Sequence, residues 1–294
     1  MKSGVKRTTP YKVISIIILV ILAILFLFPL YWIVTGAFKP TTDIYASQPV
    51  WWPSEWVTSN FEKLFTKRSA PLFEIGALVG PTVPAAIRWL VNTVFMSVAA
   101  MLLTCITAAM AGYALAKKRF VGRALLFSLI ICAMALPKQV ILIPLLKEMS
   151  ALKLYGSLWA VIFPTVGWPF GVFLMKQFCE GVPGEMLEAA RIDGASEART
   201  FTQIVVPLIK PGSGALAIFT FINSWNDYFM QLVMLPNSAN FTISLGIATL
   251  QGESSVDTGL LMSGAALAAV PIIVVFLIFQ KYFTQGITMG AVKG

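Results

Sequence analysis

Long apolar segments separated by short polar ones run through most of the chain. Six of these segments supply about 20 or more mainly apolar residues each, enough for an α-helix to cross roughly 30 Å of hydrocarbon. They lack the apolar–polar alternation of strands in a membrane β-barrel. The pattern therefore predicts an all-α polytopic membrane protein with six transmembrane helices. The predicted spans cover residues 13–37, 89–116, 124–145, 157–178, 212–235 and 260–279.

The composition agrees with this class. Of the 294 residues, 57% are hydrophobic and only 12% are charged, which is far more apolar surface than a soluble domain of this size needs. Histidine is absent, so we expect no zinc or haem site and no histidine-based catalytic triad. The three cysteines are widely spaced within or beside apolar segments, and we interpret them as small core residues.

The distribution of basic residues predicts the orientation. With the N-terminus in the cytoplasm, 14 Lys and Arg residues fall in cytoplasmic regions and seven fall outside. Most of the seven lie in one long outer loop, and long loops contribute little to the charge bias that sets orientation. Both termini are therefore predicted to be cytoplasmic. The formal charge of +9 then reflects basic cytoplasmic loops rather than nucleic-acid binding. We interpret the first apolar segment as a retained anchor, because it exceeds the core of a signal peptide and no Ala-x-Ala-like site follows it.

The spans divide the chain into three predicted parts. Residues 1–87 hold a cytoplasmic tail, the first span and a long outer loop rich in Pro and Trp, and Trp suits the headgroup layer. Residues 88–282 form a core of five spans, and residues 283–294 a cytoplasmic C-terminal tail. Within the core, residues 236–259 are predicted to be a second, polar outer segment without Lys or Arg.

A charged, helix-prone segment lies between the fourth and fifth spans. Residues 183–184, Pro and Gly, end the fourth span, and a short helix can begin near Glu185. Asp193 and Gly194 indicate a turn, and Ser196 is suited to cap a second short helix. A polar segment here cannot lie in lipid. We therefore predict a helix–turn–helix on the cytoplasmic surface, joined to both spans and available to another protein.

The same segment resembles the EAA signature of binding-protein-dependent ABC importer permeases. That signature is Glu-Ala-Ala, three residues, Gly, nine residues and Ile-x-Leu-Pro, and Val206 stands here where the family has Leu. Its remaining positions are occupied by Glu188, Ala189, Ala190, Gly194, Ile204 and Pro207. Residues 169–174, residues 223–227 and the C-terminal residues 280–294 resemble the carbohydrate branch of the family, specifically its maltose-transport G-type subunits.

The resemblance implies a type I ABC importer permease (MetI-like) fold in the bacterial cytoplasmic membrane. It also implies the partners: a second permease subunit, expected to be a different, F-type chain; two ABC ATPase subunits; and a periplasmic or extracellular solute-binding protein. Residues 183–211, the coupling segment, would dock on an ATPase. Glu188 would make a polar contact there, Ala189 and Ala190 would pack closely, and Gly194 would form the turn. Arg191, Asp193, Ile204 and Pro207 complete the predicted coupling residues.

The chain has no G-x-x-x-x-G-K-[ST] phosphate-binding loop. We therefore predict a permease subunit that is not an enzyme and binds no cofactor, with ATP and Mg used by the partner ATPases. An oligosaccharide, neutral or of the acidic uronate type, is the first candidate solute. A glycerol phosphate ester is an alternative. An intramembrane glycosyl-transfer enzyme and a passive channel are alternatives of different classes.

Polar groups inside spans are costly, so they are candidates for a solute pathway. Amide, carboxylate and aromatic groups that could bind sugars cluster in the fifth span, although they could instead hydrogen-bond neighbouring helices. Lys138 lies about 15 residues into the third span, roughly 22 Å from its inner end, and is expected to extend outward. If it faced the cavity, it would favour an acidic sugar. The candidate pathway residues are Asn223, Trp225, Asn226, Asp227, Tyr228 and Lys138.

Overall fold

The computed structural model describes residues 10–75, 78–251 and 257–291. This part of the chain contains four helical segments long and apolar enough to cross a membrane, which cover residues 11–37, 85–117, 159–180 and 258–280. Two bent helix pairs, 123–134 with 138–151 and 197–208 with 210–226, bring the number to as many as six. The six-helix prediction is therefore confirmed. The spans are α1 (Pro10–Ala37), α4 (Ala85–Lys117), α5 (Arg123–Met134) with α6 (Lys138–Ala151), α7 (Trp159–Val166) with α8 (Pro169–Glu180), α12 (Lys210–Asn226), and α15 (Thr258–Ala291).

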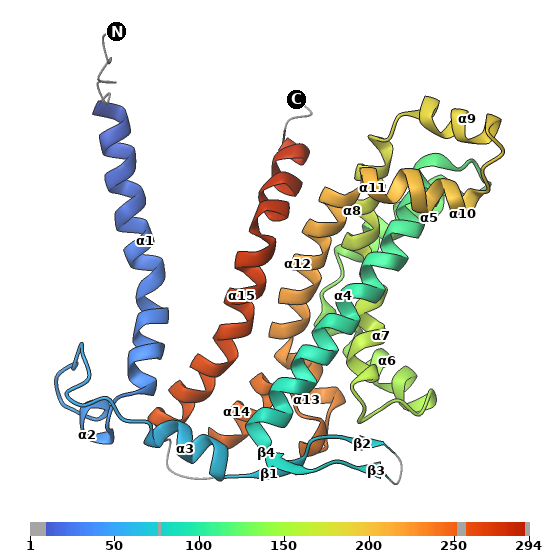
Figure 1. Cartoon of the computed structure of the whole chain (residues 1–294). Coiled ribbons are helices and arrows are strands. Elements are labelled where there is room, and N and C mark those ends of the chain that lie inside the picture. The colour runs from blue at the N-terminus through green and yellow to red at the C-terminus, as the bar shows by residue number, and fades with distance from the viewer. Residues whose placement is uncertain (1–9, 76–77, 252–256, 292–294) are drawn as a thin grey trace.

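The spans run between two sides of the molecule (Figure 1). The start of α1, the end of α15 and helix α9 (Gly184–Ile192) all lie on one side (Figure 1). We call this the inner side, following the predicted orientation, and the opposite one the outer side. Helix α15 runs to Ala291, so most of the predicted tail 283–294 continues the last helix; residues 292–294 lie outside the described residues.

The third span is not the single helix predicted over residues 124–145. Helix α5 ends at Met134, and α6 starts at Lys138 in a direction turned by 108°. Pro137 between them has an extended backbone (ψ 133°). Proline disfavours helix in the residue before it and cannot donate a helical hydrogen bond, so α5 cannot continue through this position. The 12 residues of α5 rise only about 18 Å, less than the hydrocarbon thickness. The span is therefore broken inside the membrane.

The fifth span also differs from the prediction of residues 212–235. Helix α12 ends at Asn226, and α13 (Tyr228–Met234) follows as a separate helix. Asp227 separates the two and caps α13, because its Oδ1 accepts a hydrogen bond from the backbone N–H of Met230 at 3.3 Å. The sequence pattern missed this break because apolar residues resume after Tyr228, and the polar residues 223–227 were interpreted as pathway groups within one continuous span.

Helix α4 lies at the centre of the subunit and packs against α8, α12 and α7. Small residues allow the closest approach. A Cβ placed on Gly112 would lie 2.7 Å from the backbone N of Lys176 on α8, so only glycine fits there without a shift. Ala108 and Ala109, also buried, face the same side. This packing of small residues is typical of membrane helices, which gain nothing from excluding water when they associate in lipid.

The outer side carries more structure than predicted. The first loop holds α2 (Thr41–Ile44), α3 (Ser59–Thr66) and a small antiparallel ribbon. In the ribbon, β1 (Ser69–Pro71) pairs with β4 (Thr82–Pro84), and β2 (Glu74–Ile75) pairs with β3 (Leu78–Val79). Residues 76–77 lie outside the described residues. The ribbon is a local exception to the predicted all-α class.

The second outer segment is not simply a polar loop. After a turn, η2 (Ser238–Asn240), it forms α14 (Ile243–Gln251). Ile243 and Leu245 of this helix are fully buried, and the Ile243 N–H donates to the Thr93 hydroxyl of α4 at 2.8 Å. The prediction for residues 236–259 was therefore wrong for α14, which belongs to the core; residues 252–256 are not described.

Helix α1 stands apart from the other spans except near its outer end (Figure 1). Almost all of its side chains between Tyr11 and Phe28 are exposed, whereas Thr35, Gly36 and Ala37 are buried. Its outer end is held by α3, because the Asn60 amide donates to the carbonyl of Ala37 at 3.1 Å. Most of this apolar helix is therefore left to contact lipid or another subunit.

The close approach at Gly112 generates the first prediction. Gly112→Ala should lower the stability of the subunit by about 1–3 kcal/mol, because the new methyl group must push α8 away from α4. Thermal unfolding of the protein in detergent measures the change. Gly167→Ala is the matched control, since a Cβ at Gly167 meets nothing within 4 Å. Equal unfolding temperatures for the two variants would contradict the packing argument.

Candidate functional site

The coupling segment forms a helix–turn–helix on the inner side, as predicted (Figure 1). Helix α9 (Gly184–Ile192) is followed by a turn and by a second limb that joins α12 with a bend of 77°. The second limb consists of α10 (Glu197–Thr200), a π-helical turn (Phe201–Val205) and α11 (Val206–Leu208). Both limbs continue directly into membrane spans, α8 before and α12 after.

The turn depends on Gly194. Its φ of +73° lies in the left-handed region, where side chains other than glycine are strained. The Gly194 N–H donates to the carbonyl of Arg191 at 3.1 Å, and the Ala195 N–H donates to that of Ala190 at 2.9 Å. These two bonds satisfy carbonyls at the end of α9 in the Schellman arrangement. Asp193 lies at the C-cap position just before the glycine.

The predicted cap of the second limb is also present. The Ser196 hydroxyl accepts a hydrogen bond from the backbone N–H of Arg199 at 3.3 Å, which satisfies one of the free N–H groups at the start of α10. The two limbs are therefore each terminated by local hydrogen bonds. The shape of the turn follows from the sequence of the segment itself.

The second limb is bonded to the inner end of α4 through Glu197. One carboxylate oxygen of Glu197 accepts a hydrogen bond from the Tyr113 hydroxyl at 3.1 Å, and the other is paired with the Lys118 ammonium. Arg191 of α9 lies 3.7 Å from the same carboxylate. Glu197 thus connects both limbs to the second span. The sequence analysis had joined the coupling segment only to the fourth and fifth spans.

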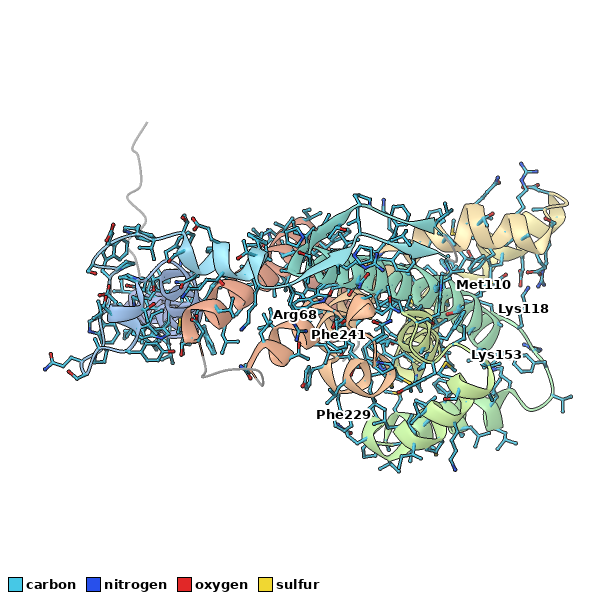
Figure 2. The ribbon with its side chains drawn as sticks, turned by 90° about the horizontal axis from the view of Figure 1, so that it is seen from below. Arg68, Met110, Lys118, Lys153, Phe229 and Phe241 are labelled. Carbon is cyan, nitrogen blue, oxygen red and sulfur yellow. The ribbon has the colours of Figure 1, made fainter. Side chains whose placement is uncertain are left out.

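Further contacts hold the first limb. The Lys117 ammonium donates to the carbonyl of Val182 at 2.6 Å and to that of Glu180 at 3.2 Å, where the chain leaves α8. Lys118, labelled in Figure 2, lies near the coupling segment. The basic end of α4 therefore binds both the start and the second limb of the coupling segment.

The charge of Glu197 is favoured by these neighbours. The hydrogen bond from Lys118 lowers the pKa of the Glu197 carboxyl below its usual value, burial opposes this, and Tyr113 and Arg191 add to the lowering. A lowered pKa in the folded state means that the contact stabilises the protein above the ordinary carboxyl pKa. The stabilisation is lost as the pH falls through the lowered value.

Helix α9 has a buried face and an exposed face. Leu187 belongs to the inner cluster of buried residues, which also contains Met175, Cys179 and Val205. Ala190 is buried as well, at 6% exposure. Ala190 therefore offers little surface to a partner in this structure, and its predicted packing against the ATPase stays a prediction. Glu188 and Ala189 are exposed, as their predicted role requires.

Two apolar residues extend the exposed face of α9, and the sequence analysis missed both. Met186 is 43% exposed and Ile192 is 87% exposed. Together with Ala189 they follow the i, i+3, i+6 spacing of one helix face. That spacing was the signal in the sequence from which both residues could have been found. A large isoleucine that is exposed on a polar surface is typical of an interaction site.

The remaining predicted coupling residues take different positions. Ile204 is partly buried and packs against the inner cluster, so it anchors the second limb. Arg191, Asp193 and Pro207 are exposed. The site therefore consists of an exposed α9 surface and a set of internal anchors.

The candidate pathway residues also divide into exposed and buried ones. Lys138 and Asp227 come together, with 3.3 Å between Nζ and Oδ2. Asn223, Asn226 and Tyr228 are exposed in the isolated chain, and the Asn226 amide donates to the carbonyl of Ile222 at 3.1 Å. Figure 2 shows Phe229, the residue after Tyr228, beside α6.

Trp225 lies elsewhere. Its side chain is 1% exposed and stacks on Phe221, with ring centroids 5.4 Å apart, inside the hydrophobic core of the outer half. As placed here it cannot contact a solute, so its prediction as a pathway residue is not supported by the geometry.

The described residues contain no group of His, Cys, Asp or Glu side chains that could hold a metal ion.

Comparison with known proteins gives a family. The family described as "Binding-protein-dependent transport system inner membrane component" matches residues 107–289. The arabinooligosaccharide transport system permease protein AraQ of Halalkalibacterium halodurans is 34% identical over 275 residues, which are 93% of each chain. The trehalose transport system permease protein SugB of Mycobacterium tuberculosis is 28% identical over 99% of this chain and 100% of that one.

A solved structure has the same fold. It belongs to a bacterial ABC transporter involved in the import of the acidic polysaccharide alginate. The TM-score is 0.73, and the match covers 96% of this chain and 99% of that chain at 20% identity. At this identity the likeness establishes the fold alone.

The Glu197 contacts generate the second prediction. Glu197→Ala should make amide hydrogen exchange in residues 184–208 roughly two- to fivefold faster at neutral pH, because partly exposed ion pairs contribute at most about 1 kcal/mol. Hydrogen-exchange mass spectrometry measures this. The difference from the unsubstituted chain should disappear in acid, once Glu197 is protonated.

Glu188→Ala is the matched control. It removes an exposed carboxylate from the same segment, and no contact holds that carboxylate among the described residues. Its exchange should stay unchanged. Equal acceleration in both variants would show that Glu197 does not hold the second limb.

Proposed function

The chain belongs to the family of binding-protein-dependent transport system inner membrane components, and from this premise we propose that it is the permease subunit of an ATP-driven sugar importer. It forms half of the translocation pathway for an oligosaccharide in the bacterial cytoplasmic membrane. The exposed α9 surface carries the proposal, because a helix joined to two spans presents Glu188, Ala189 and Ile192 to a partner on the inner side. The permease relatives named for arabinooligosaccharides and trehalose support a sugar as the solute.

The energy comes from two separate ABC ATPase subunits, which use ATP and Mg. The chain itself has no phosphate-binding loop of the Walker type. ATPase closure would press on the exposed face of α9. Because α8 and α12 continue directly from the coupling segment and Glu197 connects it to α4, three spans would move with it.

A second permease subunit completes the pathway. We propose a different, F-type chain in this position. An exposed α1 and the exposed polar residues of α12 support a partner in the membrane, since the amides of Asn223 and Asn226 would be costly against lipid. A solute-binding protein delivers the sugar to the outer side. Both termini and the coupling segment are cytoplasmic in this assignment.

Charge reversal on α9 is the third prediction. Glu188→Lys should reduce recovery of the ATPase with the purified permease by about tenfold or more, because it replaces a favourable polar contact by a repulsive or unpaired one. Co-purification from membranes and uptake of the sugar by cells measure the two consequences. Glu55→Lys, which makes the same change on an exposed residue of the outer loop, is the matched control.

The turn gives an independent test of the same proposal. Gly194→Pro should abolish ATPase recovery, because proline cannot adopt a φ of +73° and removes the N–H that donates to Arg191. Gly194→Asn should retain most of it, since asparagine tolerates the left-handed region. Normal association and uptake in both Glu188→Lys and Gly194→Pro would overturn the proposed function.

A further inference from the structure

Two helix breaks meet on the exposed side of α12. Lys138 is the first residue of α6, just after the Pro137 break, and Asp227 lies between α12 and α13. Their charged atoms are 3.3 Å apart although 89 residues separate them in the sequence. The ammonium side chain is 52% exposed and the carboxylate side chain 17% exposed. The ion pair is therefore within reach of whatever passes along this face.

The same face carries amide and phenol groups. Asn223 and Asn226 are exposed at i, i+3 on α12, whereas Ser224 and Trp225 between them are buried. Asn223 lies 13 residues into the helix, about 20 Å from its inner end and within the hydrocarbon layer. Among the contacts of the described residues its amide has no hydrogen-bond partner. Such a group is disfavoured against lipid, so this face meets water, a solute or another polar surface.

We define the polar patch as Lys138, Asn223, Asn226, Asp227 and Tyr228. Its positive and negative charges cancel. The Oδ2 of Asp227 accepts from Lys138, and its Oδ1 caps α13 by accepting from Met230. A solute carboxylate would place a second negative charge on one ammonium, leaving one anion without a counter-charge in a medium of low dielectric constant. Neutral sugar hydroxyls can instead donate to the carboxylate and accept from the ammonium and the amides.

We propose that the Lys138–Asp227 pair is a specificity determinant of the solute pathway, and that the charge-compensated polar patch selects a neutral oligosaccharide over an acidic one. This inference rests on the proposed function, a sugar permease, and deepens it by naming the substrate class. It also assigns to Lys138 a role opposite to that of an acid-binding cation.

Uptake by the complete importer tests the proposal with two probes of equal length, a neutral arabinotriose and a trigalacturonate. The unsubstituted importer should take up the neutral sugar at least tenfold faster. Asp227→Asn and Lys138→Gln each leave one charge uncompensated, and each should lower neutral uptake by about tenfold. The exchanged pair, Lys138→Asp with Asp227→Lys, should recover much of the uptake lost in either single variant.

The opposite pattern would overturn the inference. If Lys138 binds a solute carboxylate, trigalacturonate should be the better solute, Asp227→Asn should increase its uptake, and the exchanged pair should abolish it. If the unsubstituted importer assembles with its ATPases and transports neither sugar, the proposed function fails instead. The labelling experiment that follows then still decides whether the patch is compensated.

Thiol labelling measures the charge of the patch without any solute. Asn223→Cys, in a chain with Cys105, Cys132 and Cys179 replaced by alanine, is treated with methanethiosulfonates bearing a cationic or an anionic group. With the pair intact the two rates should agree within about threefold, and Asp227→Asn should favour the anionic reagent by about tenfold. An anionic preference in the intact pair, or no labelling at all, would contradict a compensated and solvent-accessible patch.

Discussion

The fold depends on one requirement of the lipid environment: every backbone N–H and C=O group in the membrane must be bonded within the protein. Continuous helices meet it at once, and a broken span meets it only where other elements or water cover the break. At the break after α12, Asp227 caps the following helix α13 by accepting a hydrogen bond from the Met230 N–H. Its other carboxylate oxygen pairs with Lys138, the first residue after the break between α5 and α6. Polar chemistry inside the membrane is thus concentrated where the helices are interrupted.

Helix α4 connects the two sides of the molecule on which function depends. At its inner end Tyr113 and Lys118 bond to Glu197 of the coupling segment. At its outer end the Asn92 amide donates to the carbonyls of Ala239 and Phe241, both at 2.9 Å, in the connection between α13 and α14. Between these ends it packs on α8 through Gly112. In the proposed function, a displacement of the coupling segment would therefore be transmitted by a single packed helix to the segment that faces outward.

Local chemistry made part of this structure predictable. Gly194 allows the left-handed turn that ends α9, and Ser196 caps the helix that follows, so the shape of the coupling segment could be derived from its own residues. Long-range packing could not be derived in this way. That Ala190 is covered, that Trp225 lies in the core and that Glu197 reaches Tyr113 all depend on how distant helices meet. Hydropathy also concealed the break at Asp227, since apolar residues resume after Tyr228 and the polar residues 223–227 fit one continuous span as groups that line a pathway.

The proposed polar patch and the coupling segment lie at the two ends of one helix. Helix α12 runs without interruption from Lys210, at the bend that follows α11, to Asn226, beside the ion pair. A rotation imposed on the coupling segment by an ATPase would therefore be carried along about 25 Å of helix to Asp227. Lys138 belongs instead to α6, which reaches the inner side only through α5. The ion pair thus joins an element that moves directly with the coupling segment to one that does not, and its geometry is expected to change when the ATPases close.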